Sequence, residues 1–367
     1  MRVSERRSKQ FGYLTCFDRS VLTFARSALT SSLFQSRLHC TMSRTKIDRR
    51  VVLKSILTSA AVTAGTLTAF ADEPQQTVVS RLKFDSPQMQ TWKVGLILKT
   101  PVNCTNVLAT FPVPVSWPEQ KVTLKSKNID PLVTRWQFRD VASNGKQVVL
   151  GMNAVPAGST VQCTMEFEIE RSRILPLEKT DDLVIPKRID RSLRLYIGNS
   201  PYIDTSNSRI KKAWKEIAAM DADNDWQRVE QIYDYVRAKV QYVEGSIKNA
   251  SVALREGKGD CEEMTSLFVA LCRNARVPAR IVWVPDHCYP EFYLEDADGN
   301  GHWIPCQAAG TRQFGRMDEY RPVLQKGDRF KVPEKRTPIR YISEFFKCDR
   351  KGKRNPDPMF IRERIEQ

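Results

Sequence analysis

Cys261 and His287 are the residues of this sequence best placed for nucleophilic chemistry. Cys261 follows Asp260, whose carboxylate can cap a helix by accepting N–H bonds from the first turn. Apolar residues then recur at helical spacing, at Met264, Leu267, Phe268, Leu271 and Ala275. Cys261 is therefore expected in the first turn of a buried helix, where the helix dipole lowers the pKa of a thiol and favours the thiolate. The alternative is a small, buried core cysteine.

A cysteine nucleophile needs an imidazole to take or hold its proton, and a third group to orient that imidazole. Beyond residue 71 the chain contains only two histidines, His287 and His302. His287 opens a predicted strand that can end over the helix N-terminus, whereas His302 follows a turn and precedes Trp303. Either histidine can be purely structural, but the pairing with Cys261 favours His287 as the base.

Helices and strands with apolar faces are predicted around these residues. Two core helices cover Ser206–Met220 and a stretch that begins near Asp225, which is expected to cap it. A flexible loop over residues 245–258 then leads to the Cys261 helix. Three strands follow, at 281–284, 287–294 and 302–307.

Five motifs follow one another from Gly259 onward: Gly259-Asp260-Cys261, Leu267–Arg273, Val277–Arg280, His287-x-Tyr289-x-Glu291 and Trp303-Ile304-Pro305. In this order they resemble the bacterial transglutaminase-like domain, over about residues 205–310. The resemblance implies a papain-like fold, in which a helix that carries the nucleophile packs on an antiparallel sheet that carries His and Asp. It also implies acyl transfer through a thioester, to an amine or to water, with Cys261 as the nucleophile and His287 as the base.

Gln307 departs from the family pattern. The family usually reads Trp-x-Pro-x-Asp, and here the run ends Pro305-Cys306-Gln307. An amide oxygen can accept the imidazole N–H and orient the ring, but it supplies no negative charge to stabilise the imidazolium. Two functions therefore stay open. One is a cysteine enzyme that acts on peptide or protein amides, with the Cys261 N–H in its oxyanion hole. The other is a non-catalytic binding or structural protein that has lost the triad Asp.

Seven cysteines follow residue 71, an odd number, so at least one thiol stays unpaired. Cys104 and Cys163 are either a disulfide or two buried thiols, and the same alternatives hold for Cys288 and Cys306. No CxxC pair is present, so a zinc site of the usual spacing is not expected. The predicted cysteine chemistry requires no metal and no organic cofactor.

The N-terminal region, residues 1–71, is predicted to contain an export signal. Arg49-Arg50 precede an apolar run over residues 55–70, as in a twin-arginine signal, and Ala69-Phe70-Ala71 is an A-x-A cleavage site. We expect cleavage after Ala71, a periplasmic or extracellular location and no stable membrane span in the mature chain. An uncleaved anchor is the alternative. Translation from Met42 would give a signal of normal form, because residues 1–41 are a basic extension before it.

Composition and pattern together predict an α+β protein. Residues 1–71 are the extension and signal, 72–195 an antiparallel β-sandwich, 196–345 the transglutaminase-like domain and 346–367 a basic C-terminal tail. The first 71 residues hold 12 of the 58 Lys and Arg and 3 of the 42 Asp and Glu, so the remainder carries a net charge of +7. Without an aromatic-interleaved basic stripe, nucleic acid is not expected as a partner. The expected partner is a peptide or protein substrate in the cell envelope; the sequence predicts no oligomeric state.

Overall fold

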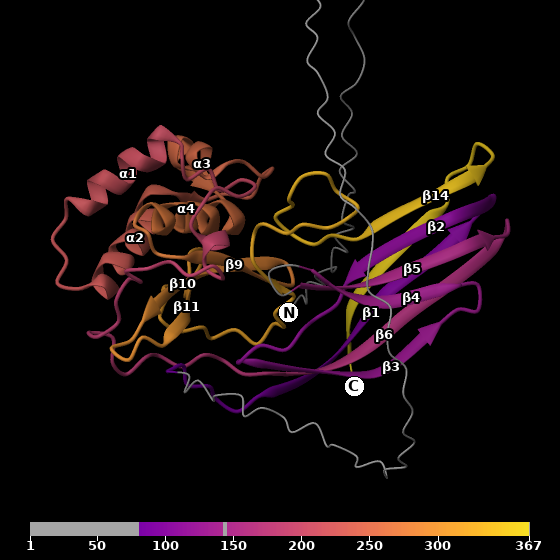
Figure 1. Ribbon diagram of the computed structural model, residues 1–367, viewed down its shortest axis with the longest axis horizontal. Coiled ribbons are helices and arrows are strands. Elements are labelled where there is room, and N and C mark those ends of the chain that lie inside the picture. Colours follow the sequence, from indigo (N-terminus) through magenta and orange to yellow (C-terminus); the bar gives the residue numbers. More distant parts are fainter. Residues whose placement is uncertain (1–80, 142–144, 367) are drawn as a thin grey trace, which may run out of the picture. The chain divides into compact units, whose positions relative to one another are not determined.

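The computed structural model describes residues 81–141 and 145–366 (Figure 1). The proposed signal and its cleavage site at Ala71 lie outside the described residues. All described residues belong to one compact unit. Strands and helices both contribute, and nearly all strand pairs are antiparallel, so the predicted α+β class is confirmed. No helix in the described part of the chain is both long enough and apolar enough to cross a membrane.

Two four-stranded antiparallel sheets contain the strands of the N-terminal half. One sheet has the order β15-β1-β6-β3, with β1 (Gln88–Thr100), β3 (Gln120–Ile129), β6 (Ser159–Arg171) and β15 (Asp357–Ile365). The other has the order β14-β2-β5-β4, with β2 (Asn103–Pro112), β4 (Arg135–Val141), β5 (Gly145–Val155) and β14 (Phe345–Lys351). The inner faces share one hydrophobic cluster, to which β1 gives Leu96, β2 gives Phe111 and β5 gives Leu150. Alternate burial along β6 accounts for its strand pattern.

The expected basic tail over 346–367 is instead folded. Its residues supply β14 and β15, which pair with β2 and β1 at the edges of the two sheets. Phe346 and Phe360 pack against the hydrophobic cluster of the sheets. Lys and Arg occupy exposed positions of these edge strands, where charges prevent further strand pairing. Because these charges lie between the apolar residues, the sequence of 346–367 shows no clear apolar alternation that would predict the two strands.

Four helices lie in the second half of the chain: α1 (Ser208–Ala218), α2 (Asp225–Lys239), α3 (Ala250–Glu256) and α4 (Cys261–Asn274). The helix α4 contacts all three others (Figure 1). Asn224, rather than Asp225, caps α2, and the Asp225 carboxylate accepts a bond from the Ile185 N–H at 2.7 Å. α3 falls within the loop predicted over 245–258, because seven residues are too few to show a helical period.

A five-stranded antiparallel sheet packs on the other side of α4. Its order is β12-β11-β10-β9-β13, with β9 (Ala279–Val284), β10 (His287–Glu295), β11 (Gly301–Gln307), β12 (Gln313–Phe314) and β13 (Gln325–Lys326). Every residue of β9 is buried. One face of β9 packs against the α4 cluster and the other against Ile174 and Met317. Burial on both faces explains why β9 is continuously apolar from Ile281 to Val284.

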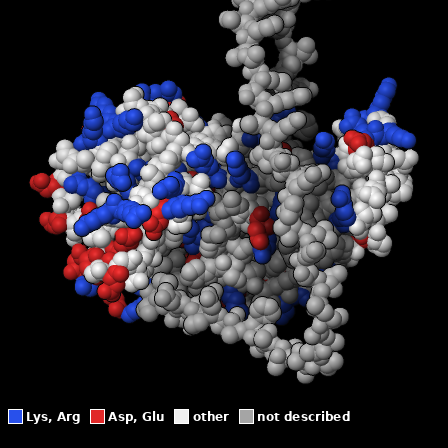
Figure 2. All heavy atoms as spheres, in the orientation of Figure 1, with Lys and Arg blue, Asp and Glu red and all other residues white. Residues whose placement is uncertain are grey.

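The helical part carries surface charge of both signs. Lys and Arg side chains spread over the visible face of this part, and Asp and Glu gather along its lower edge (Figure 2). The exposed side of α1 alone presents Arg209, Lys211, Lys212 and Lys215. Its buried side presents Ile210, Ala213 and Ile217 to the core. The basic residues of α1 thus form the solvated face of an amphipathic helix.

Candidate active site

The local sequence fixes Cys261 at the first position of α4. The Asp260 carboxylate accepts the N–H of Glu262 at 2.8 Å, and the Glu263 carboxylate accepts the N–H of Asp260 at 2.8 Å, which is a reciprocal capping box. Gly259 allows the chain to pass close to this box, because a Cβ there would lie 2.7 Å from the Cβ of Glu263. The helix start is therefore determined by residues 259–263 themselves.

His287 and Gln307 meet at the ends of neighbouring strands. The Nε2 atom of His287 lies 2.9 Å from the Oε1 atom of Gln307. An amide oxygen only accepts hydrogen bonds, so Nε2 carries a proton and Nδ1 is left for the hydrogen bond between His287 and Cys261. The backbone carbonyl oxygen of Gln307, a different atom from Oε1, accepts hydrogen bonds from the Tyr233 hydroxyl at 2.8 Å and from Arg237 at 3.3 Å. The structure thus brings Cys261, His287 and Gln307 together; their catalytic roles stay a prediction.

Opposite pKa shifts mark the pair of Cys261 and His287. A hydrogen bond from Cys288 and, despite burial, the bond and charge of His287 lower the pKa of Cys261 to about 5. Burial opposes the charge of His287, but its bonds to Cys261 and Gln307 outweigh burial and raise the pKa of His287. Each group favours the charged form of the other. The arrangement can hold a thiolate and an imidazolium side by side near neutral pH.

His302 lies away from this pair. Its side chain is buried, and its Nε2 atom lies 2.9 Å from the Oδ2 atom of Asp296. Burial opposes the charge of Asp296, but bonds from His302 and Asn300 outweigh burial and lower the pKa of Asp296 to about 2. The Asp296 carboxylate also accepts the backbone N–H of Asn300 at 2.9 Å. His302 therefore stabilises the turn between β10 and β11.

All seven described cysteines are free thiols. The register of β10 and β11 places Glu291 opposite Pro305, so Cys306 lies opposite Pro290, two residues away from Cys288. Such diagonal neighbours are about 7–8 Å apart, too far for an unstrained disulfide.

In the two sheets, Cys104 and Cys163 lie on strands of different sheets. The thiol of Cys104 hydrogen-bonds Cys348 of β14 instead. The cysteine that hydrogen-bonds Cys104 therefore belongs to the segment that we expected to be a tail.

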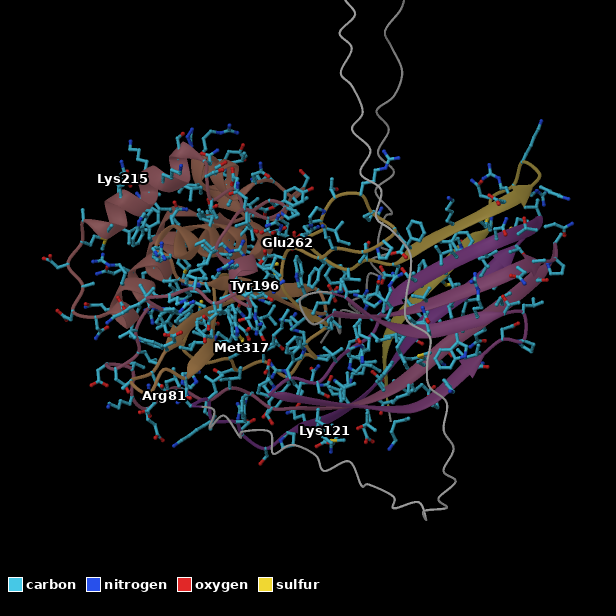
Figure 3. All side chains as sticks on the ribbon, viewed as in Figure 1. Arg81, Lys121, Tyr196, Lys215, Glu262 and Met317 are labelled. Atoms are coloured by element: carbon cyan, nitrogen blue, oxygen red, sulfur yellow. The ribbon has the colours of Figure 1, made fainter. Side chains whose placement is uncertain are left out.

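The sequence analysis missed two groups near the pair, Arg321 and Arg340, and considered a third, Cys288, only as a disulfide partner or a buried thiol. The Arg321 guanidinium donates to the Glu319 carboxylate at 2.6 and 2.9 Å and to the Pro285 carbonyl oxygen at 2.9 Å, and its charge counteracts the raised pKa of His287. Arg340 forms an ion pair with Glu262. Figure 3 labels the position of Glu262. Cys288 contacts Cys261 directly. Arg321 and Arg340 come from an irregular segment, so no local pattern could have indicated them.

Comparisons with known proteins agree with the motifs in the sequence. Residues 212–308 match the model of the transglutaminase-like superfamily. No curated protein matches the chain. A crystal structure of a candidate cysteine protease from Cytophaga hutchinsonii is 17% identical, with a TM-score of 0.49, over 78% of this chain and 94% of that one. A candidate protease from Parabacteroides distasonis is 10% identical, with a TM-score of 0.24, over 61% and 47% of the two chains.

Proposed function

We propose that this chain, whose residues 212–308 match the transglutaminase-like superfamily, is a cysteine enzyme that transfers or hydrolyses acyl groups of peptide or protein amides. The observation that supports this most is the contact of Cys261 with His287, with their pKa values shifted in opposite directions. A helix-terminal thiol with a lowered pKa and an adjacent imidazole is the arrangement that an activated cysteine nucleophile needs.

In the first half of the reaction the Cys261 thiolate attacks the amide carbonyl, and a C–S bond forms. The Cys261 N–H is one of the first N–H groups of α4, which have no acceptor within the helix, so it is available to the oxyanion. The His287 imidazolium gives its Nδ1 proton to the leaving nitrogen as the C–N bond breaks. The products are an amine and a thioester on Cys261.

In the second half a water molecule or an amine attacks the thioester. His287, now neutral, takes the proton of this nucleophile at Nδ1, and the thiolate leaves. Gln307 keeps the ring oriented throughout, because its side-chain oxygen accepts a hydrogen bond from the Nε2–H group. Gln307 supplies no charge, which is the observation that favours the second candidate, a non-catalytic protein with the same fold. These steps use only side chains and backbone groups of this chain.

We further propose how the remaining parts serve this enzyme. The two four-stranded sheets form the predicted β-sandwich, which acts as a scaffold for the domain that carries α4. The twin-arginine signal directs the chain out of the cytoplasm, so the substrate is a peptide or protein of the cell envelope. N-terminal sequencing of the mature protein tests the export proposal: a chain that begins at Asp72 supports cleavage, and a chain that retains residues 1–41 contradicts it.

A thioester on Cys261 is the direct test of the enzymatic proposal. The purified protein is incubated with casein-like and envelope peptides, with and without an amine acceptor, and its intact mass is measured after acid quenching. We expect a covalent acyl adduct and released amine or ammonia with the wild type and with His302→Gln, whose histidine lies outside the site. Cys261→Ala should give neither. Equal product release by the wild type and Cys261→Ala would contradict the proposal that Cys261 is the nucleophile. If the wild type gives neither adduct nor product with any of the peptides, the result favours the non-catalytic candidate.

A further inference from the structure

Cys288 is a second sulfur at the candidate active site, and the steps above do not use it. It follows His287 at the start of β10 and is 1% exposed. Side chains alternate between the two faces of a strand, so Cys288 shares a face with Phe292 and Leu294. All three belong to the hydrophobic cluster that includes the buried side of α4. The Cys288 side chain therefore points towards α4.

Two contacts place Cys288 against the first turn of α4. Thr265 lies one turn after Cys261, and its hydroxyl donates to the Cys288 carbonyl oxygen at 3.5 Å. The thiol of Cys288 is itself hydrogen-bonded to the sulfur of Cys261. Cys261 thus has two hydrogen-bonding neighbours on β10, the imidazole of His287 and the thiol of Cys288.

The environments of the two sulfurs decide which one holds its proton. Burial, together with the negative charge of Cys261, raises the pKa of Cys288 well above its ordinary value. Cys261 is partly exposed at the end of a helix, and its pKa is lowered to about 5. At a pH above about 5 and below the raised pKa of Cys288, the Cys288 thiol is an S–H donor and the Cys261 thiolate is its acceptor.

We propose that Cys288 is a further catalytic residue, whose S–H group donates a hydrogen bond to the Cys261 thiolate. A thiol is a weak donor, but a charged acceptor makes such a bond stronger. The usual orienting carboxylate would stabilise the positive partner of the thiolate–imidazolium pair by its negative charge, whereas Gln307 does so only by accepting a hydrogen bond. Cys288 stabilises the negative partner instead, which offsets part of that loss.

The other ionisable groups around Cys261 do not provide this stabilisation. Asp260 on the same helix raises the pKa of Cys261 by its negative charge. Glu262 is likewise acidic and is paired with Arg340. Burial and the charge of Cys261 raise the pKa of Tyr242 of β7 (Gln241–Tyr242), but Tyr242 is not among the groups that lower the pKa of Cys261. Apart from His287, Cys288 is thus the group named here that lowers the pKa of Cys261.

The test measures the pH dependence of Cys261 alkylation rather than turnover, so it stands whether or not the site acts on peptides. Full-length protein receives short pulses of iodoacetamide between pH 3.5 and 9, and labelling of the Cys261 peptide is quantified by mass spectrometry. Two variants remove the donor, Cys288→Ala and Cys288→Val, and Cys288→Ser keeps one. Cys272→Ala is the matched control, because it removes a fully buried thiol from α4 itself.

We expect the wild type and Cys272→Ala to share a midpoint near pH 5. The midpoint of Cys288→Ala and Cys288→Val should rise by at least one unit, which lowers labelling about tenfold at pH values below both midpoints. Cys288→Ser should lie closer to the wild type. Circular dichroism at each pH shows which variants are folded, and the two donor-free side chains differ in volume, so that one can serve if the other fails to fold.

Two results would overturn the proposal. The first is a folded donor-free variant whose alkylation profile coincides with that of the wild type. The second is a Cys288→Ser midpoint shifted as far as that of Cys288→Ala, because this would assign the effect of Cys288 to packing rather than to hydrogen bonding.

Discussion

At the scale of single residues, Gln307 decides how the imidazole behaves. Its Oε1 atom lies 2.9 Å from His287 Nε2, where the related motif would place an Asp. A Gln side chain is one methylene longer than that of Asp, so Glu is the carboxylate that can occupy the same place. The amide orients the ring without adding charge, and this is the difference that substitutions at position 307 can measure.

Gln307→Glu should raise the pKa of His287 further, because a carboxylate adds a negative charge to the hydrogen bond by which the amide already favours the imidazolium. A raised imidazole pKa keeps the proton for the leaving group to higher pH, so the alkaline limb of the activity profile should move to higher pH. Gln307→Leu removes the acceptor, and activity should fall by about two to four orders of magnitude if ring orientation is lost. NMR titration of the His287 ring checks the first effect, and steady-state rates check the second. Unchanged titration and rates in both variants would exclude Gln307 from the machinery.

At the scale of the secondary-structure element, the capping box of α4 has two separable effects. The Asp260 side chain stabilises the helix start as an acceptor, and its negative charge opposes the thiolate of Cys261. Asn caps helices about as well as Asp but carries no charge. A pair of substitutions at this position therefore distinguishes helix stability from thiol ionisation.

Asp260→Ala should lower the free energy of unfolding by about 1 kcal/mol, because the Glu262 N–H at the start of α4 loses its acceptor. Asp260→Asn should keep most of that stability, and it should lower the pKa of Cys261 further by removing the negative charge. Urea titration measures the first quantity, and iodoacetamide labelling below pH 5 measures the second. Equal losses of stability in the two variants, with Cys261 labelled at the wild-type rate in both, would contradict separate effects of the Asp260 side chain on helix stability and on thiol ionisation.

How far the sequence predicts these elements depends on how local their causes are. The start of α4 and the strands that carry His287 and Gln307 follow from capping residues and from apolar periodicity within a few positions. β14 and β15 were missed because their charges occupy exposed edge positions, and α3 because it is only seven residues long. The contact of Cys288 with Cys261 and the charge of Arg321 near His287 depend on packing between distant segments, for which no local pattern exists.

At the scale of the whole molecule, buried polar bonds join the four-stranded sheet that contains β3 and β6 to the strand that carries His287. Arg171 of β6 is fully buried and donates to the Tyr289 hydroxyl at 3.4 Å, two residues beyond His287. The Lys326 ammonium of β13 lies 2.7 Å from a Glu119 oxygen and 2.6 Å from a Glu291 oxygen, and all three side chains are at most 3% exposed. The sheet that contains β3 and β6 therefore helps to hold β10 in place.

Lys326→Met should lower the free energy of unfolding by about 3–5 kcal/mol, because two buried carboxylates lose their shared cation. The wild type should unfold in a single transition by both calorimetry and tryptophan fluorescence, since the two halves share this network. Lys83→Met is the control: Lys83 pairs with Glu178 at the surface, where solvent screens the interaction and its removal has little effect. Equal stabilities of the two variants would contradict a structural role for the buried network.

The central claim is that Cys261 is a thiolate held by His287, and the reactivity of its sulfur tests this most directly. Folded protein is labelled with limiting iodoacetamide at pH 6, and labelling of Cys261 is compared with that of Cys348, the other described cysteine that is not buried. The pKa of Cys261 is lowered to about 5 and that of Cys348 is raised to about 11, so Cys261 should react far faster. His287→Ala should slow the labelling of Cys261 and reduce this difference, because the bond and charge of His287 help to lower the pKa of Cys261. Equal, slow labelling of both cysteines in the wild type would contradict the account.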